Sequence, residues 1–494
     1  MAQPTLFFYD LETSGIHPDT DRIMQFAGQR VDQELNKVGE PFNFLIQLNE
    51  DVLPDPQAIL IHGIAPQQTI LEGLTEAEFL HEFYASIVTE NTTFVGYNNI
   101  RFDDEFMRFL NFRNLYDPYA WTWEKARSRW DILDVVRMTR ALRPEGINWP
   151  LDSSSKPTNR LESLAQANNL NQVKAHDALS DVEATIDLAR LIKLRQPKLF
   201  NYLFSMRIKE NAAKLINNNQ PFIYTSRRYP STNLHTTLAV KIASNSSNAN
   251  SFLVYDLRFD PTPWLNLSSE QLADSWRFTF DRNLEENPLL PVKTVKLNRC
   301  PAIAPQNIIR SDPDALKRLS LNLRDIDQHF ETIKNADVTE FGVRLNKALE
   351  ILNQEQNVRQ QKRKIALDTR LYDGFYNDHD RKLVQELHTD GESASRVRAL
   401  RDRFSDPRLT QLCSFYLGRN YKRELSESER TGWDKYLKRH LLDGNGNSRL
   451  ALYFKQIADL VQERTDSRSQ VLLEDLKLYG ESLIPTDYVA EEVD

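Results

Sequence analysis

The first residues with a clear capacity for chemistry are two carboxylates near the amino end. Asp10 and Glu12 flank Leu11, directly after the apolar run Leu6-Phe7-Phe8-Tyr9. Residues two apart on a strand share a face, so the two carboxylates are expected to project together. Adjacent carboxylates repel each other unless a cation neutralises them, and hard oxygen ligands favour Mg²⁺ or Mn²⁺ over zinc. By itself the tripeptide also fits a solvated strand end, so a metal site needs further ligands.

Two later segments supply further carboxylates and a histidine. Asp103 follows a polar turn where a strand-like run gives way to a helix, and its neighbour Asp104 is the stronger candidate for a helix N-cap. Asp181 falls in the first turns of another predicted helix, with His176 just before it. A histidine whose pKa lies near neutrality can accept a proton from an attacking water molecule. Each segment alone also fits a capping or surface role.

Together the segments contribute four carboxylates and one histidine, the set that two-metal phosphodiester cleavage requires. Their order, D-x-E, N-x-x-F-D and H-x-x-x-x-D, resembles the DEDD exonuclease superfamily. It resembles the histidine subclass in particular, because no tyrosine stands four residues before Asp181. The resemblance implies that His176 is the general base. It also implies two Mg²⁺ ions, with Mn²⁺ as an alternative, held by Asp10, Glu12, Asp103 and Asp181.

The elements that must position these residues alternate along the chain. Residues 5–200 combine strand-like runs with amphipathic helices, which predicts an α/β fold with a mixed sheet. Capping-box matches at Thr75–Glu78 and Asn159–Glu162 predict helix starts, the first helix reaching about Val88. A later helix is expected from about Ala178 to Leu194, ending before Pro197. Further strands are predicted at Met24–Val31, Phe42–Leu48 and Thr93–Tyr97.

The pattern changes after residue 198. Strand-like runs alternate with turn residues up to about residue 350, which predicts a small β-barrel with attached helices and a hairpin loop at Ser244–Asn248. The polar segment Asn353–Lys364 is interpreted as a linker, and residues 365–485 are mostly helical in pattern. The predicted domains are 1–196, 197–352 and 353–494. The strands expected in the barrel are Leu238–Ile242, Phe252–Leu257 and Val292–Leu297.

A surface for single-stranded nucleic acid is predicted between Tyr116 and Arg143. Aromatic rings stack on unpaired bases while arginines follow phosphates, and this stretch interleaves the two. Trp121 and Trp130 are nevertheless more typical of a buried core. Because the net charge is −8, any basic surface must be local rather than general. The other interleaved residues are Tyr119, Trp123, Lys125, Arg127, Arg129, Arg137 and Arg140.

Longer motifs narrow the resemblance to the bacterial exonuclease I family. They are Gly96-Tyr97-Asn98-Asn99, Tyr116-Asp117-Pro118-Tyr119-Ala120-Trp121, Ala141–Pro150, Leu371-Tyr372-Asp373-Gly374-Phe375 and Arg419-Asn420-Tyr421. The resemblance covers nearly the whole chain. It implies a ribonuclease-H-like exonuclease core, an SH3-like barrel and an α-helical C-terminal domain. It also implies 3′→5′ removal of 5′-mononucleotides from single-stranded DNA, in DNA repair and recombination.

The same resemblance assigns binding residues. Glu12 and Arg160 are implied to contact the substrate, and an anionic ligand would suit an arginine at a helix N-terminus, where acids are otherwise preferred. Arg143 and Tyr202 match positions that receive the acidic, apolar C-terminal tail of single-stranded-DNA-binding protein. An arginine beside an aromatic groove suits a terminal carboxylate. The single strand is implied to lie against Arg108, Tyr119, Trp123 and Arg137.

Composition sets the remaining expectations. Cys300 and Cys413 are the only cysteines and have no ligand-spaced neighbours, which favours a reducing cytoplasm and argues against a zinc site. The family resemblance implies that this is the cytoplasm of a bacterium. The chain shows no signal peptide and no run approaching the roughly 20 apolar residues that span a bilayer, so we expect no membrane association. A monomer is expected. One alternative is a DEDD-type processing ribonuclease or proofreading exonuclease, because the acidic residues do not determine whether the substrate is DNA or RNA. The other is a non-catalytic single-strand-binding repair scaffold.

Overall fold

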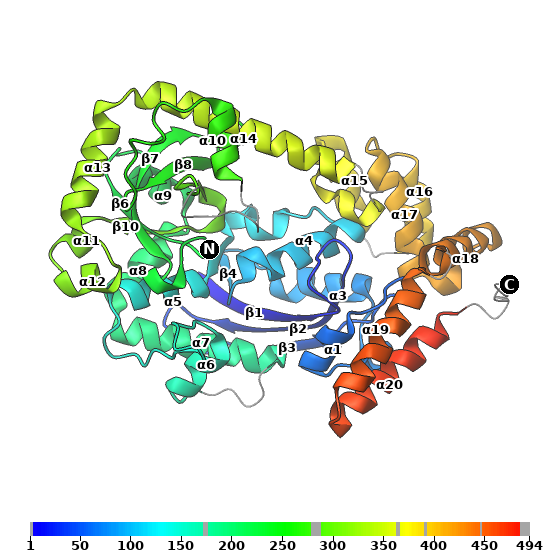
Figure 1. The fold of residues 1–494 in the computed structure, drawn as a ribbon. Coiled ribbons are helices and arrows are strands. Elements are labelled where there is room, and N and C mark those ends of the chain that lie inside the picture. Colours follow the sequence, from blue (N-terminus) through cyan, green and yellow to red (C-terminus); the bar gives the residue numbers. More distant parts are fainter. Residues whose placement is uncertain are drawn as a thin grey trace. The chain divides into compact units, whose positions relative to one another are not determined.

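The computed structural model describes residues 3–170, 176–277, 288–361, 366–389, 393–444 and 447–484. The chain forms two compact units. Figure 1 shows the helices and strands of the chain, coloured along the sequence. The first unit consists of Met1–Arg127, Gln172–Glu183 and Ala366–Asp494. The second consists of Ser128–Asn171 and Ala184–Ile365. Each unit is therefore assembled from segments that are far apart in the sequence.

The first unit is built on a mixed sheet. Strand β1 (Thr5–Thr13) pairs antiparallel with β2 (Ile23–Val31) and parallel with β4 (Thr92–Gly96). Strand β3 (Phe42–Leu45) pairs antiparallel with β2 on the outer side. Because β1 has neighbours on both edges and helices around it, most of its side chains are buried on both faces. The mixed sheet predicted from the sequence is confirmed.

Aromatic side chains form the core of this sheet. Phe7, Phe26 and Phe94 come from three adjacent strands, and Trp121 packs edge-on against Phe94 with ring centroids 4.9 Å apart. Trp121 is completely buried, as predicted. The helices beside the sheet are α1 (Pro56–His62), α2 (Pro66–Glu72), α3 (Glu76–Glu82), the π-helical turn η1 (Phe83–Ile87), α4 (Asp103–Arg113) and the start of α7 (Ala178–Arg195).

The C-terminal segment of the first unit is helical, as predicted. Helix α17 packs against α4, where Phe109 and Phe112 share a core with Leu412 and Tyr416. Helix α20 packs against α1 and α2. The helices of this segment are α15 (Asp378–Thr389), α16 (Ala394–Arg401), α17 (Pro407–Asn420), α18 (Glu427–Leu442), α19 (Arg449–Glu463) and α20 (Ser467–Ser482).

The second unit is built on an antiparallel sheet with strand order β10-β6-β7-β8-β9. Its strands are β6 (Phe222–Thr225), β7 (Thr236–Ser244), β8 (Ser251–Asp256), β9 (Val292–Lys296) and β10 (Ala302–Pro305). The predicted hairpin between β7 and β8 is confirmed. The unit also contains β5 (Ser128–Asp131), α5 (Ile132–Leu142), α6 (Leu161–Ala167), α8 (Pro197–Met206), α9 (Lys209–Ile216), α10 (Ser269–Trp276), α11 (Asn307–Arg310), α12 (Pro313–Arg318), α13 (Leu323–Asn335) and α14 (Val338–Gln361).

Two local predictions are wrong. The segment interpreted as a linker, Asn353–Lys364, is helical through Gln361 as the end of α14, while residues 362–365 lie outside the described ranges. A polar helix exposed to solvent has the same composition as a linker. The capping box expected at Asn159 is also absent, because α6 has Arg160 as its N-cap without a side-chain capping bond. The capping box at Thr75 is confirmed.

Candidate active site

The carboxylates of Asp10, Glu12 and Asp181 converge at one end of β1. Each offers an oxygen atom, and these three atoms all lie within 4.8 Å of one another. Asp10 and Glu12 are brought together by the two-residue repeat of β1, as predicted. Three carboxylate oxygens at this spacing fit a hard divalent cation such as Mg²⁺ or Mn²⁺.

A side chain on β2 contacts the start of α7, the helix that carries Asp181. Gln25 lies directly opposite Glu12 in the antiparallel register. Its Oε1 accepts a hydrogen bond from the backbone N–H of Ala178, the first residue of α7, over 3.3 Å. The first turn of α7 is therefore held against the end of the sheet, and Asp181 lies one turn further along. Asp177 accepts from the N–H of Ser180 at 3.2 Å and so stabilises the helix start.

The electrostatics of Asp10 are those of a crowded acidic site. Burial raises its pKa well above the ordinary value, and the charges of Asp103, Glu12 and Asp181 raise it further. A carboxyl whose ionisation is opposed by three neighbouring carboxylates is stabilised in its charged form by a cation. Asp103 is not among the residues whose ligand oxygens converge with Asp10 and Glu12, although its charge is one of those that raise the pKa of Asp10.

Asp103 and Asp104 are the first two residues of α4, and both are buried. The N-cap of this helix is Phe102, which makes no side-chain capping bond, so the N-cap role considered for Asp104 is wrong. Instead, Oδ1 of Asp104 accepts from the hydroxyl of Tyr9 at 2.5 Å and from Nδ2 of Asn99 at 3.4 Å. The carboxylate of Asp104 is thus engaged with the sheet and the preceding turn.

His176 lies in a turn just before α7 and is exposed. Its backbone has φ = 61°, in the left-handed region that few residues other than glycine and asparagine adopt. His176 is not among the residues whose ligand atoms converge with Asp10. Residues 171–175, which precede it, lie outside the described ranges.

An aromatic surface in the first unit includes two of the predicted strand-binding residues. Trp123 is 62% exposed, and the ring of Tyr119 lies 5.5 Å from that of Phe375, which is 76% exposed. These rings line a pocket of about 130 Å³. The guanidinium of Arg108 lies over Tyr119 at 5.6 Å and pairs with Glu105 at 2.7 Å. No strand-binding role was predicted for Phe375 from the sequence, although this residue ends the motif Leu371–Phe375.

The remaining predicted residues lie in the second unit. Arg137 donates to Asp134 at 2.7 Å, and Arg143 pairs with Asp312 at 3.2 Å. The side chain of Arg160 is 77% exposed, at the N-terminus of α6. Tyr202 lies on α8, where burial raises its pKa to about 12. The structure describes these residues within their own unit and not relative to the acidic group.

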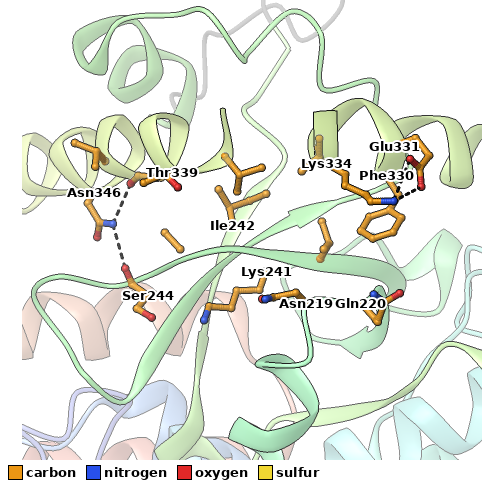
Figure 2. A pocket seen from close by; sticks show the side chains of 16 residues that line it. Asn219, Gln220, Lys241, Ile242, Ser244, Phe330, Glu331, Lys334, Thr339 and Asn346 are labelled. Atoms are coloured by element: carbon orange, nitrogen blue, oxygen red, sulfur yellow. Dashed lines mark hydrogen bonds and ion pairs between the residues drawn. The ribbon is translucent and has the colours of Figure 1, made fainter. Parts of the chain in front are cut away.

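The second unit also contains a groove of about 820 Å³, shown in Figure 2. It lies between β7 and helices α13 and α14, and its lining includes Lys241, Ser244, Lys334 and Asn346. Asn346 donates to the backbone oxygen of Ser244 at 3.1 Å, and Lys334 pairs with Glu331. Among the residues that the structure describes here, the groove brings together no group of acidic or histidine ligands. The group of acidic side chains at the end of β1 is therefore the candidate metal site.

Family models match three successive parts of the chain. Residues 7–189 match an exonuclease model, residues 207–351 the exonuclease I SH3-like domain, and residues 366–483 the exonuclease I C-terminal domain. Fold and acidic site together define the class: a divalent-metal-dependent exonuclease. The predicted core, SH3-like domain and helical C-terminal domain are confirmed.

Whole-chain relatives specify the family. Exodeoxyribonuclease I of Escherichia coli (strain K12) is 37% identical over 98% of this chain and 98% of its own. The solved structure of a moderately thermophilic exonuclease I from Methylocaldum szegediense matches with a TM-score of 0.89 and 38% identity over 98% of this chain and 100% of its own. Escherichia coli exonuclease I bound to a dA16 oligonucleotide matches with a TM-score of 0.88 and 35% identity over the same shares. The chain belongs to the exodeoxyribonuclease I family.

Two further matches bear on substrate and partner. One solved structure is a complex described as SSB/exonuclease I with an inhibitor, and it matches with a TM-score of 0.86 over 98% of this chain. Ribonuclease T of Yersinia enterocolitica is 27% identical but covers only 29% of this chain. The ribonuclease similarity is thus limited to part of the chain, whereas the deoxyribonuclease similarity extends over nearly all of it.

Proposed function

We propose that this chain removes 5′-mononucleotides from the 3′ ends of single-stranded DNA. The observation that carries the proposal is the convergence of Asp10, Glu12 and Asp181 in a chain that is similar to exodeoxyribonuclease I over nearly its whole length. Two Mg²⁺ ions, or Mn²⁺ in their place, would activate water, stabilise the leaving 3′-oxygen and clamp the phosphate. The proposed ligands are Asp10, Glu12, Asp103 and Asp181.

His176 is proposed as the general base. Its exposed position in the turn before α7 gives solvent access to the imidazole, as a base that takes a proton from attacking water requires. Glu12 and Arg160 are proposed to contact the terminal nucleotide. The exposed guanidinium of Arg160 supports that role, because a helix N-terminus favours an anion and the side chain adds its own positive charge.

Preference for single strands is proposed to come from stacking. Tyr119, Trp123 and Phe375 offer ring faces or edges that unpaired bases can meet, at about 1–3 kcal/mol per stacked base. Paired bases are already stacked inside a duplex and cannot use these rings. Arg108 and Arg137 are proposed to neutralise phosphates, as arginines do without reading the sequence.

Three domains are proposed at 1–196, 197–352 and 353–494, with α14 continuing across the second boundary. We propose a monomer that acts in DNA repair and recombination in the bacterial cytoplasm, which is supported by the lack of a disulfide between Cys300 and Cys413. Among the described residues no helix is both long and apolar enough to cross a membrane. Arg143 and Tyr202 are proposed to receive the C-terminal tail of single-stranded-DNA-binding protein, whose carboxylate would compete with Asp312 for Arg143.

Digestion of end-labelled oligonucleotides tests the proposal directly. Single-stranded DNA labelled at the 5′ end should shorten progressively in Mg²⁺, whereas a 3′ label should be released at once as a mononucleotide. Duplex DNA and single-stranded RNA should persist, and a chelator should stop the reaction. Faster loss of RNA would favour the processing ribonuclease that the partial similarity to ribonuclease T suggests. Strand binding without cleavage in any divalent metal would favour a repair scaffold.

A further inference from the structure

One hydrogen bond joins the two elements that carry Asp10 and Asp103. The hydroxyl of Tyr9, on β1, donates to Oδ1 of Asp104, in the first turn of α4, over 2.5 Å. Tyr9 precedes Asp10 and Asp104 follows Asp103, so the bond connects the direct chain neighbours of two proposed metal ligands. The bond therefore links the end of β1 to the start of α4.

Both partners of this bond are fixed by burial. Tyr9 is 2% exposed and Asp104 is 0% exposed. The ring of Tyr9 stacks on Phe26 with centroids 5.9 Å apart and meets Trp121 edge-on at 6.3 Å. A ring packed at this density cannot follow a moving helix, so the hydroxyl restrains α4. Successive strand side chains point to opposite faces, which leaves Asp10 directed away from this core.

A restraint here opposes a specific force. Carboxylates that share a cation site repel each other until the cation binds, so the elements that carry Asp10 and Asp103 need a restraint that keeps them together. The N-cap residue of α4 makes no side-chain capping bond, so it does not hold the start of the helix. The bond from Tyr9 to Asp104 provides a restraint at this point. Asn99 adds a second and longer contact to the same oxygen of Asp104, at 3.4 Å.

We propose that Tyr9 is a positioning residue which, through Asp104, holds the carboxylates of Asp10 and Asp103 at the separation that a divalent cation requires. The inference rests on the proposed function, since it takes both carboxylates as metal ligands. Groups that support metal ligands typically change metal affinity by roughly 10–100-fold when removed. Tyr9 acts through the neighbour of a ligand, so the effect belongs at the lower end of that range.

The test substitution is Tyr9→Phe in the full-length chain, because it removes the hydroxyl and keeps the ring. Two quantities are measured: the Mg²⁺ concentration that gives half the maximal digestion rate of a fluorescent single-stranded oligonucleotide, and the Kd for Mn²⁺ by calorimetry without DNA. Both should rise about tenfold. The rate at saturating Mg²⁺ should stay close to that of the unsubstituted chain, because excess cation restores the separation.

Tyr84→Phe is the matched control. Its hydroxyl donates to Oδ1 of Asn111 at 2.7 Å in the same unit, and its ring stacks on Tyr116, so it removes a comparable bond away from the acidic group. It should lower the melting temperature about as much as Tyr9→Phe without changing the Mg²⁺ requirement. An unchanged requirement in Tyr9→Phe, or the same shift in both variants, would overturn the inference.

Variants at Asp104 test the same link from the other side. Asp104→Ala should raise the Mg²⁺ requirement as Tyr9→Phe does, and the double variant should be no worse than either alone. Asp104→Asn keeps an acceptor oxygen in place and should shift the requirement less. Additive effects in the double variant would overturn the inference. If the unsubstituted chain binds no Mn²⁺ and digests no strand, the proposed function itself fails; normal metal-dependent digestion unaffected by Tyr9→Phe refutes only the role of Tyr9.

Discussion

Replacing Asp368 with alanine should destabilise the first unit by about 3–5 kcal/mol, the usual cost of removing one partner from a buried ion pair. Oδ2 of Asp368 accepts from Arg22 at 2.8 Å and from Arg419 at 2.7 Å. The two arginine side chains are only 3% and 2% exposed. Without the carboxylate, Arg22 and Arg419 keep Glu76 and Asp51 as partners but lose a shared counter-charge that water cannot replace.

The pH dependence of this contribution has a definite sign. Burial opposes ionisation of Asp368, but the charges of Arg419 and Arg22 prevail and hold its pKa well below the ordinary value. A group whose pKa is lowered by folding contributes stability that is complete above its unfolded pKa, about 4, and is lost as the pH falls through the folded pKa. The difference between the unsubstituted chain and Asp368→Ala should therefore be constant from pH 8 to about 5 and shrink below about pH 4.

Urea denaturation of both proteins, followed by circular dichroism between pH 8 and 3, measures this difference. Glu386→Ala is the control. Glu386 pairs with Arg403 at 3.0 Å, but the two side chains are 43% and 51% exposed, and a solvated pair contributes about 1 kcal/mol or less. A loss at Asp368 as small as that at Glu386 would refute the reasoning, because the buried cluster would then contribute no more than a surface pair.

The same substitution should also slow digestion. The backbone N–H of Arg22 donates to the hydroxyl of Ser14 at 2.8 Å, and the N–H of Ser14 donates to the carbonyl of Arg22 at 2.8 Å. These bonds close the turn that directly follows Glu12 and Thr13. Because Asp368 anchors Arg22, its loss loosens the turn beside a proposed metal ligand.

Three further substitutions test the proposed mechanism. Asp181→Ala should abolish cleavage but leave the anisotropy-measured Kd for single-stranded DNA in chelator unchanged, and an equal loss of binding would indicate misfolding instead. His176→Ala should lower kcat by roughly 10²–10⁴-fold with the calorimetric Kd for Mn²⁺ intact, whereas near-normal turnover would reject the general-base assignment. Trp123→Ala should weaken single-strand binding by about 1–3 kcal/mol, and an unchanged Kd would exclude stacking there. Binding should also weaken with added salt, and a salt-independent Kd would contradict the proposed phosphate contacts.

Local patterns made part of the fold predictable. The capping box at Thr75 and the two-residue repeat of Asp10 and Glu12 depend on neighbours within a few positions, and both are present in the structure. The capping match at Asn159 failed because a polar residue near a helix start need not adopt N-cap geometry, and the adjacent Arg160 takes that position. The polar end of α14 has the composition of a linker, because the helix carries no apolar stripe there that periodicity can detect.

Contacts between residues far apart in the sequence could not be predicted from local patterns. Arg22 and Asp368 are 346 positions apart, and neither has a motif that would join them. The link between Gln25 and Ala178, which brings α7 to the strand, spans 153 positions. Such pairs become visible only when both partners are placed in space. Phe375 is a further example: its ring lies close to that of Tyr119, and its sequence motif does not indicate this contact.

The buried acids of the first unit fall into two groups that sequence cannot separate. Burial alone would raise the pKa of Asp51 and Asp368, but both face arginines, and their pKa values are lowered. For Asp10 the principal influences are burial and other carboxylates, and its pKa is raised. Acids of the first kind are already neutralised by the protein and hold its segments together. Asp10 instead lies among other carboxylates, whose charges oppose its ionisation. A bound cation would relieve the repulsion between these carboxylates. The charges that face each carboxylate therefore distinguish Asp10 from Asp51 and Asp368, although all three are the same residue type.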